Sequence, residues 1–269
     1  MPGSAVTHIY LSPHLDDAVY SCGGMIHRQV QSEGRVVVVT LCAGDPPAGP
    51  VSDYAISLHQ RWQADAGVAL RAAPAEVVSA RRGEDLAALS MLGAQAVHLD
   101  VPDCIYRQNP ANGGPMYTSN AAILGPLSPA EFSLIRRVAT KLTNLLHGFG
   151  RHHLYVPLGI GQHVDHQLTR RAAEVVGAVY AYYEDFPYVM RETDHSPSPA
   201  VAGPHGRSLI PELIRLSEAD LSARVKAMAL YKSQLSSFWT SPAALDEAVR
   251  AFTAQVGGQA PAERIWRVG

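Results

Sequence analysis

Short apolar runs alternate with longer amphipathic stretches along most of the chain. Five runs rich in β-branched and aromatic residues predict strands: THIYLS at 7–12, RVVVVTLC at 35–42, AQAVHLD at 94–100, HHLYVPL at 152–158 and AVYAYY at 178–183. Apolar positions at helical spacing predict helices at 18–31, 56–70, 83–92, 129–146, 164–176, 217–238 and 242–256, followed by a short closing RIWRV.

This alternation of strands and helices is typical of a parallel sheet covered on both faces. We therefore expect an α/β fold with a Rossmann-like, doubly wound and mostly parallel sheet. In the common doubly wound order, 3-2-1-4-5, the first and fourth strands are neighbours, and a crevice opens at their carboxyl ends. Polar residues that follow these two strands would then meet in one place.

The 269 residues, 47% of them hydrophobic, suffice for one large α/β domain, and no internal repeat appears. We expect a single domain over residues 1–269. Three stretches rich in Gly, Pro and polar residues interrupt the pattern at 43–53, 107–129 and 191–208. Loops of this length in a compact domain are typically lids or binding loops. The second stretch, which carries Met116, Tyr117, Ile123 and Leu124, is expected to form part of a substrate-entry wall, with a solvated insertion as the alternative.

Composition and charge exclude several classes of partner. A net charge of −2 gives no bulk attraction to nucleic acid or to an anionic membrane, which leaves small molecules open. The three cysteines, Cys22, Cys42 and Cys104, are an odd number without paired spacing, so we expect buried thiols in a reducing compartment. No stretch predicts a signal peptide or a membrane span. We expect a cytoplasmic protein, and self-association into a homo-oligomer stays open.

The first polar cluster follows directly on the first predicted strand, in SPHLDDAVYSCGG at 12–24. Charge so near a buried strand is costly unless something binds there. His14 and Asp17 are three residues apart, so a turn entering a helix would place both on one side, while Asp16 projects at another angle. A capping role would explain an Asp at this position, but it would not explain His14.

A second cluster follows the fourth predicted strand, in VPLGIGQHVDHQ at 156–167. His163 and His166 repeat the spacing of three, and Asp165 lies between them. A single His in such a place is usually a surface or hydrogen-bonded residue. Two similar clusters, each after a strand that the expected topology sets beside the other, are hard to attribute to chance. Together they supply two imidazoles and a carboxylate for a metal, with a carboxylate and an imidazole left over.

These groups are the parts of a hydrolytic site. Three protein ligands with an open position for water are the pattern of catalytic zinc, which lowers the pKa of that water to about 7. A spare Asp can take the proton of the water, and a spare His can donate to the oxyanion. Two histidines and a carboxylate also describe a non-haem iron(II) site, so iron stays open.

A dinucleotide-binding oxidoreductase is a weaker interpretation that rests on fold class alone. The sequence PHLDDA stands where a G-x-G-x-x-G fingerprint would follow the first strand, and its two carboxylates would repel a pyrophosphate. Gly23 and Gly24 are better explained by close packing of a helix against the sheet.

The two clusters carry a resemblance to a known family. SPHLDDAVYSCGG resembles the P/A-H-x-D-D signature of the LmbE-like, or PIG-L, superfamily of metal-dependent N-deacetylases, and QHVDHQ resembles its H-x-D-H signature. Supporting stretches extend the resemblance over most of the chain: RRGEDLAALSMLGA at 81–94, YYEDFPY at 182–188 and KAMALYKSQ at 226–234.

The resemblance implies roles for particular residues. It implies one zinc ion per chain, held by His14, Asp17 and His166. It implies Asp16 as the general base, His163 as the group that stabilises the oxyanion and Asp165 as the group that orients a neighbouring imidazole. Arg81, three residues before Glu84, and Asp103 match positions that hold the sugar in relatives. A surface ion pair within the helix is the plainer interpretation of Arg81. We expect Glu184 and Asp185, at the end of the fifth strand, to shape the sugar pocket.

The expected function is that of a zinc-dependent hydrolase that removes an N-acyl group, in the first place acetyl, from an amino sugar or its conjugate. Leu15 and Ala18 stand where relatives acting on glucosamine conjugates often have Pro and Glu, which leaves the identity of the sugar open. They also motivate an alternative, a non-catalytic, metal-containing sugar-binding protein of the same fold. Asp16, His163 and Asp165 argue against it, because a structural metal site needs no spare base or donor.

Overall fold

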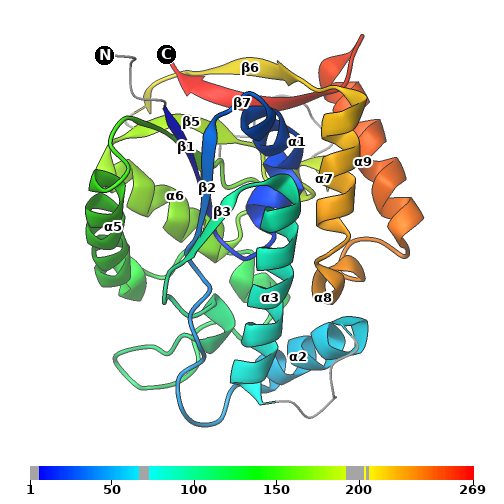
Figure 1. Cartoon of the computed structure of the whole chain (residues 1–269). Coiled ribbons are helices and arrows are strands. Elements are labelled where there is room, and N and C mark those ends of the chain that lie inside the picture. Colours follow the sequence, from blue (N-terminus) through cyan, green and yellow to red (C-terminus); the bar gives the residue numbers. More distant parts are fainter. Residues whose placement is uncertain (1–5, 67–72, 192–202, 204–205) are drawn as a thin grey trace.

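The computed structural model describes residues 6–66, 73–191, 203 and 206–269, and its strands form one seven-stranded sheet in the order β3-β2-β1-β4-β5-β7-β6 (Figure 1). The strands are β1 (Thr7–Ser12), β2 (Arg35–Thr40), β3 (Gln95–His98), β4 (His152–Pro157), β5 (Val179–Tyr183), β6 (Leu209–Arg215) and β7 (Ala262–Val268). The first five pair in parallel, β7 is antiparallel to β5, and β6 is antiparallel to β7. The expected order 3-2-1-4-5 is confirmed, and two antiparallel strands extend it.

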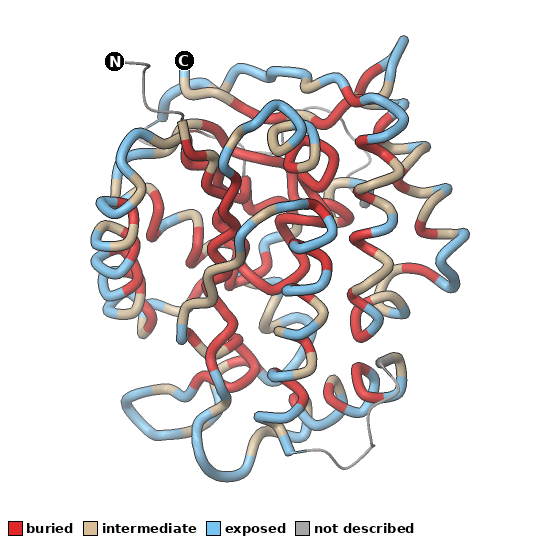
Figure 2. Tube along the Cα trace, viewed as in Figure 1, coloured by how far each residue is buried: buried red, intermediate tan, exposed pale blue. Residues whose placement is uncertain are grey.

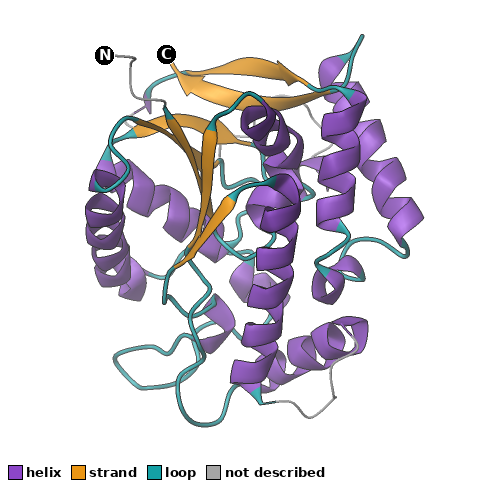
Figure 3. Cartoon of the chain, viewed as in Figure 1, coloured by secondary structure: helices purple, strands orange, loops and turns teal. Residues whose placement is uncertain are grey.

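Helices cover both faces of the sheet, as predicted (Figure 3). The described helices are α1 (Asp17–Gln31), α2 (Asp53–Ala66), α3 (Pro74–Leu92), α4 (Asn120–Ile123), α5 (Phe132–His147), α6 (Val164–Val176), α7 (Glu218–Met228), α8 (Lys232–Leu235) and α9 (Pro242–Gly257). Helices α5 and α6 pack on one face, and α1, α3, α7 and α9 contribute to the core on the other. Within the described ranges, no helix is both long enough and apolar enough to cross a membrane.

The alternating direction of side chains along each strand divides the core into two layers. In β1, Ile9 and Leu11 point into the layer under α5 and α6, while Tyr10 points into the layer under α1. Because both faces are covered, the central strands read as continuous apolar runs rather than as alternating ones. Figure 2 shows the buried positions concentrated along the central strands and on the inward sides of the helices.

Close packing explains the paired glycines of α1, but their nearest neighbours lie mainly in α7 and the chain before it rather than in the sheet, where the sequence predicted them. A Cβ at Gly23 would lie 2.9 Å from Cγ of Arg224, and one at Gly24 would lie 2.7 Å from Cδ1 of Leu216. Both contacts are shorter than ordinary van der Waals distances, so only glycine lets α1 approach α7 and the chain before it this closely.

Three elements differ from the prediction. Helix α3 begins at Pro74 rather than at 83. Its first turns were missed because the buried polar residue Arg81 interrupts their apolar periodicity. The stretch predicted as one helix from 217 to 238 is broken, since Tyr231 between α7 and α8 has non-helical dihedral angles and turns inward. Strand β6 was missed because it is an exposed edge strand containing Pro211, which lacks the usual apolar signal.

The irregular stretches keep most of their predicted character. Residues 43–52 contain no helix, and α2 begins at Asp53. The stretch 107–129 contains the short helix α4. In the third stretch, 192–202 and 204–205 lie outside the described residues, as do 67–70 at the end of the second predicted helix.

Candidate metal centre and active site

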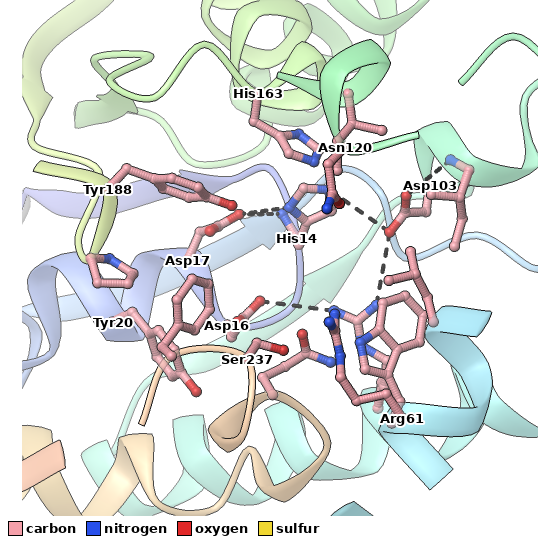
Figure 4. A pocket seen from close by; sticks show the side chains of 18 of the residues that line it. His14, Asp16, Asp17, Tyr20, Arg61, Asp103, Asn120, His163, Tyr188 and Ser237 are labelled. Atoms are coloured by element: carbon pink, nitrogen blue, oxygen red, sulfur yellow. Dashed lines mark hydrogen bonds and ion pairs between the residues drawn. The ribbon is translucent and has the colours of Figure 1, made fainter. Parts of the chain in front are cut away.

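The two polar clusters meet at the carboxyl ends of β1 and β4. These strands pair in parallel from Thr7 opposite His152 to Tyr10 opposite Tyr155, so the turns that follow them lie side by side. The ring centroids of His14 and His163 are 4.8 Å apart, although the residues are far apart in the sequence. Figure 4 shows His14, Asp16, Asp17 and His163 gathered around one cleft.

Three side chains converge on a position that fits a metal ion. Oδ2 of Asp17 lies 3.0 Å from Nδ1 of His14 and 3.2 Å from Nε2 of His166. Ligand atoms about 2.0–2.2 Å from a tetrahedral zinc ion would lie roughly 3.4 Å apart, so these separations suit a shared cation. Nε2 of His166 is buried and faces Oδ2 of Asp17, but it makes no well-formed hydrogen bond within the described part of the chain. A cation bound between these two atoms would contact both of them.

The carboxylates around the imidazoles favour positive charge at this point. Burial by itself would lower the pKa of His166, but Asp17 and Asp185 raise it to about 10. Burial likewise opposes protonation of His14, and Asp165 and Asp17 overcome it, raising its pKa well above the usual value. A proton and a metal ion would compete for the same nitrogen atoms, so the carboxylates that favour the proton would also favour a bound cation.

His163 is a further candidate ligand, because its ligand atom lies within 4.8 Å of those of His14 and His166. Buried thiols also lie near, as Cys42 groups with His14 and Cys104 with His163. Burial raises the pKa of both thiols well above its usual value, so they remain protonated and are poor ligands. Cys22 is buried as well, and none of the three forms a disulfide, as the sequence predicted.

Asp165 lies behind His14 rather than in the cleft. Its Oδ2 is 3.0 Å from Nε2 of His14 and accepts a hydrogen bond from the backbone N–H of Cys104 at 3.0 Å. Burial would raise the pKa of Asp165, but the ion pair with Arg107 and the contact with His14 hold it well below the usual range. The charged carboxylate therefore keeps a proton on Nε2 of His14 and leaves Nδ1 for a cation.

Arg107 was not predicted to take part in the site. It is buried and pairs with Asp165 on one side and with Glu131 on the other, where Nε lies 2.5 Å from Oε1. Arg107 opens the irregular stretch 107–129. A buried arginine in a polar loop leaves no signal of periodicity, so only the packing reveals its role.

Asp185 holds the second imidazole in the same way. Its Oδ1 lies 2.6 Å from Nδ1 of His166, and its Oδ2 accepts hydrogen bonds from the backbone N–H groups of Gly159 and Ile160 at 2.7 and 2.8 Å. We expected Asp185 and Glu184 to shape the sugar pocket, but neither lines the cleft. Glu184 instead accepts hydrogen bonds from Arg264 and Trp266. Asp185 therefore orients the imidazole of His166 and does not line the cleft.

His163 caps helix α6 and keeps a proton available to the cleft. Its Nδ1 accepts a hydrogen bond from the backbone N–H of Asp165 at 3.2 Å. Burial and the neighbouring His14 lower the pKa of His163 well below its usual value, so the ring is neutral. A neutral imidazole that accepts at Nδ1 carries its proton on Nε2. His163 lines the cleft and can donate a hydrogen bond there.

Asp16 lies beside the three converging side chains. Although it stands at the N-cap position of α1, its side chain makes no capping hydrogen bond, so the capping interpretation is wrong for Asp16. Oδ1 of Asp16 is 3.9 Å from Nη2 of Arg81. Burial and the adjacent Asp17 raise the pKa of Asp16 to about 6. Its carboxylate faces the cleft, where it can exchange a proton.

Arg81 and Asp103 also line the cleft. Nη1 of Arg81 is 3.8 Å from Oδ2 of Asp103, and its guanidinium lies 4.3 Å from the centre of the Trp62 ring. The plainer interpretation of Arg81 as a surface ion pair within its helix is wrong, because Arg81 is buried and Glu84 binds Ser233.

The outer walls of the cleft come from α2, the 107–129 stretch and the segments after β5 and α8. One face of α2 contributes Tyr54, Leu58, Arg61 and Trp62. Asn120 and Ile123 of α4 line the cleft, and Oδ1 of Asn120 accepts a hydrogen bond from the hydroxyl of Tyr54 at 2.6 Å. Tyr188 packs against Gly161, where φ is +83° and a Cβ would lie 2.7 Å from its ring.

Comparisons with known proteins place this geometry in context. A family model described as PIG-L, GlcNAc-PI de-N-acetylase, matches residues 9–176, more than half of the chain. The 2'-N-acetylparomamine deacetylase of Niallia circulans is 28% identical over an alignment of 191 residues, which covers 67% of this chain and 66% of that protein. The chain thus matches just under two thirds of the length of that relative.

Solved structures give a similar result. The zinc-inhibited form of teicoplanin deacetylase is 27% identical, covers 98% of each chain and superposes with a TM-score of 0.85. The N,N'-diacetylchitobiose deacetylase from Pyrococcus horikoshii has a TM-score of 0.60, covering 99% of this chain and 84% of that one. At 15% identity, the second likeness shows a shared fold only.

Proposed function

The chain belongs to the PIG-L, or GlcNAc-PI de-N-acetylase, family, as its two signatures predicted, and on that basis we propose that it is a metal-dependent N-deacetylase of an amino sugar or an amino-sugar conjugate. The observation that carries the proposal is the convergence of His14, Asp17 and His166 in a cleft that also exposes Asp16. We further propose that residues 1–269 form a single deacetylase domain.

His14, Asp17 and His166 would hold one divalent cation. Zinc is favoured over iron(II), because amide hydrolysis needs a Lewis acid and no redox change. When bound, the cation supplies charge that polarises the amide carbonyl and lowers the pKa of a water molecule. Asp165 and Asp185 support it by fixing the orientation and tautomer of the two imidazoles.

The remaining side chains of the cleft would move protons and hold the substrate. Asp16 takes a proton from the water that attacks the amide carbon, and it later gives that proton to the departing amine as the C–N bond breaks. Nε2–H of His163 donates to the carbonyl oxygen as negative charge develops on it. The products are a carboxylate, which is acetate for an N-acetyl substrate, and the free amino sugar.

Arg81 and Asp103 would bind the sugar itself, since both face the cleft near Asp16. Asn120 and Ile123 support the expectation that the 107–129 stretch forms part of the substrate-entry wall. Leu15 and Ala18, which motivated the non-catalytic alternative, are buried in the core and do not line the cleft. The departures from the commoner signature therefore leave the proposed ligands and base untouched.

A panel of N-acylated amino sugars tests the proposal directly. The panel should include N-acetylglucosamine, N,N'-diacetylchitobiose and an N-acetylated aminoglycoside, and release of acetate or free amine is measured. We expect turnover of at least one compound. Thermal stabilisation by these compounds without turnover of any would favour the non-catalytic alternative.

A further inference from the structure

Helix α3 is linked to the cleft wall by a chain of hydrogen bonds outside the proposed metal centre. Glu84 accepts two hydrogen bonds from Ser233, one from its backbone N–H at 2.9 Å and one from its hydroxyl at 2.6 Å. The hydroxyl oxygen of Ser233 in turn accepts a hydrogen bond from Nε2 of Gln234 at 3.1 Å. Gln234 lines the cleft, so the chain runs from α3 to the substrate side of α8.

The donor and acceptor of each hydrogen bond in this series follow from the chemistry of the three side chains. A carboxylate can only accept, and a serine hydroxyl has a single proton, which goes to Glu84. The oxygen of Ser233 can then only accept from its other neighbour. The amide nitrogen of Gln234 must therefore face Ser233, and its carbonyl oxygen lies at the opposite end of the amide.

That carbonyl oxygen is left for a ligand. Gln234 is only 7% exposed, and its Oε1 makes no hydrogen bond with any described residue. Because Gln234 lines the cleft, its free oxygen can accept a hydrogen bond from a donor on a bound molecule. Arg81 lies three residues before Glu84 on the same helix and also faces the cleft. Helix α3 thus places the donor Arg81 in the cleft and, through Glu84, orients the acceptor Gln234 of α8.

Resting on the amino-sugar deacetylase function proposed above, we propose that Gln234 is a specificity-determining residue that accepts a hydrogen bond from a hydroxyl group of the sugar. Glu84 and Ser233 are positioning residues that set the direction of its amide. The cleft therefore selects substrates that carry a hydroxyl donor at this position.

Deoxygenated substrates test the contact. The values of kcat and KM are measured for N-acetylglucosamine and for its 3-deoxy, 4-deoxy and 6-deoxy analogues. One analogue should be poorer than the parent sugar by roughly 3- to 10-fold in kcat/KM, which is what a neutral hydrogen bond contributes. Gln234→Leu should abolish that difference, because it should raise the KM for the parent sugar and leave the KM for the analogue nearly unchanged. Gln29→Leu, which alters a glutamine bonded to Tyr10 and Tyr155 away from the cleft, should preserve the difference.

Glu84→Gln tests the positioning role. The backbone N–H of Ser233 can only donate, so the oxygen of the new amide must face it, and the new NH₂ group faces the hydroxyl. The hydroxyl proton then turns toward Gln234 and reverses its amide, which presents NH₂ to the cleft. We expect the same loss of discrimination as in Gln234→Leu, with bound metal and Tm measured alongside.

Adding Gln234→Glu to Glu84→Gln should restore the discrimination. The new carboxylate accepts the Ser233 hydroxyl with one oxygen and offers the other to the cleft. A purely structural role for Glu84 would give no such rescue. The inference is overturned if Gln234→Leu keeps the preference for the hydroxyl or if the wild type never shows one. Absence of hydrolysis of every N-acylated sugar tested would overturn the proposed function as well.

Discussion

Strands β1 and β4 carry histidines at both of their ends, and the two ends behave differently. At the amino ends, His8 and His153 are partners across the sheet, with ring centroids 5.6 Å apart. At the carboxyl ends, His14 and His163 are similarly close, with centroids 4.8 Å apart. Proximity of imidazoles is therefore common to both ends and does not by itself define a metal site.

The neighbours of the histidines make the difference. Nδ1 of His8 lies 3.1 Å from the hydroxyl of Tyr155, and the ring of His153 stacks on Tyr180 at 3.6 Å. Burial lowers the pKa of both His8 and His153, with smaller effects from neighbouring positive groups. At the carboxyl ends, carboxylates surround the imidazoles and favour a cation. The lesson is that the buried carboxylates around the imidazoles distinguish the proposed metal centre from the amino ends of the strands.

The amino ends also border a second cavity, which gives a further contrast. It is lined in part by His8, Gln29, Tyr155 and Tyr180. Gln29 accepts a hydrogen bond from the hydroxyl of Tyr10 at 2.8 Å and donates one to that of Tyr155 at 3.2 Å. These polar groups satisfy one another, whereas Nε2 of His166 has no hydrogen-bond partner among the described residues. The hydrogen bonds among these residues give no indication of a ligand in the second cavity.

The largest expected effect separates the two ends directly. His166→Ala should reduce bound metal from near one equivalent to background and should abolish turnover, because it removes a proposed ligand. His8→Ala should leave both unchanged. Elemental analysis and acetate release measure the two effects, and circular dichroism confirms that each variant is folded. Equal metal loss in both variants would contradict the distinction between the two ends.

Asp16→Asn should lower kcat by about 10²–10⁴-fold, the usual contribution of general acid–base catalysis. Bound metal should stay near one equivalent, since Asp16 is not a proposed ligand. Asp45→Asn, at an exposed carboxylate paired with Arg82, is the matched control. Full activity of Asp16→Asn would remove Asp16 from the proposed reaction.

His163→Ala sharpens the contrast within the cleft. If His163 donates to the developing oxyanion, kcat should fall by about 10²–10³-fold while the metal is retained. The ligand atoms of His14, His163 and His166 lie within 4.8 Å of one another, so His163 could also bind the metal. Loss of metal from this variant would assign His163 to the ligand set and refute the donor role.

Asp185→Asn should weaken metal binding by about 10–100-fold, the usual effect of losing the carboxylate behind a ligating imidazole. Titration with a competing chelator measures the affinity. Glu184→Gln is the matched control, because the adjacent carboxylate binds Arg264 and Trp266 and does not contact His166. A similar loss of affinity in both variants would indicate a general disturbance of the segment.

The smallest effect concerns His8 and the pH dependence of stability. Its pKa is lowered in the folded state, so the unfolded chain binds the proton more readily, and stability falls as the pH drops below about 6.5. His8→Phe should reduce this loss, narrowing the difference in Tm between pH 7.5 and pH 5.5 by less than about 4 °C. An unchanged or larger difference would show that His8 is not neutral in the folded protein.

The residues of the proposed metal centre could be selected from the sequence because its parts are local. His14 and Asp17 are three residues apart, as are His163 and His166, and each pair follows a strand whose neighbour the topology rule supplies. The supporting residues could not be predicted in this way. Arg107 and Asp185 reach Asp165 and His166 only after packing, and no periodic pattern marks such contacts.

The fold shows the same division. The central strands were recognised because burial on both faces makes them continuously apolar. Strand β6 was not, because an edge strand that is largely exposed has no reason to be apolar. The start of α3 was missed because Arg81 points inward and lines the cleft, so the first turns of the helix lack a regular apolar stripe.

Metal dependence of acetate release tests the central claim most directly. The purified protein is assayed on its best N-acetylated amino sugar as isolated, after chelation, and after addition of one equivalent of zinc or iron(II). One equivalent is used because zinc inhibits a related deacetylase. We predict that activity disappears with the metal and returns at one equivalent in the wild type but not in His166→Ala. Acetate release that continues at full rate without bound metal would contradict the proposed mechanism.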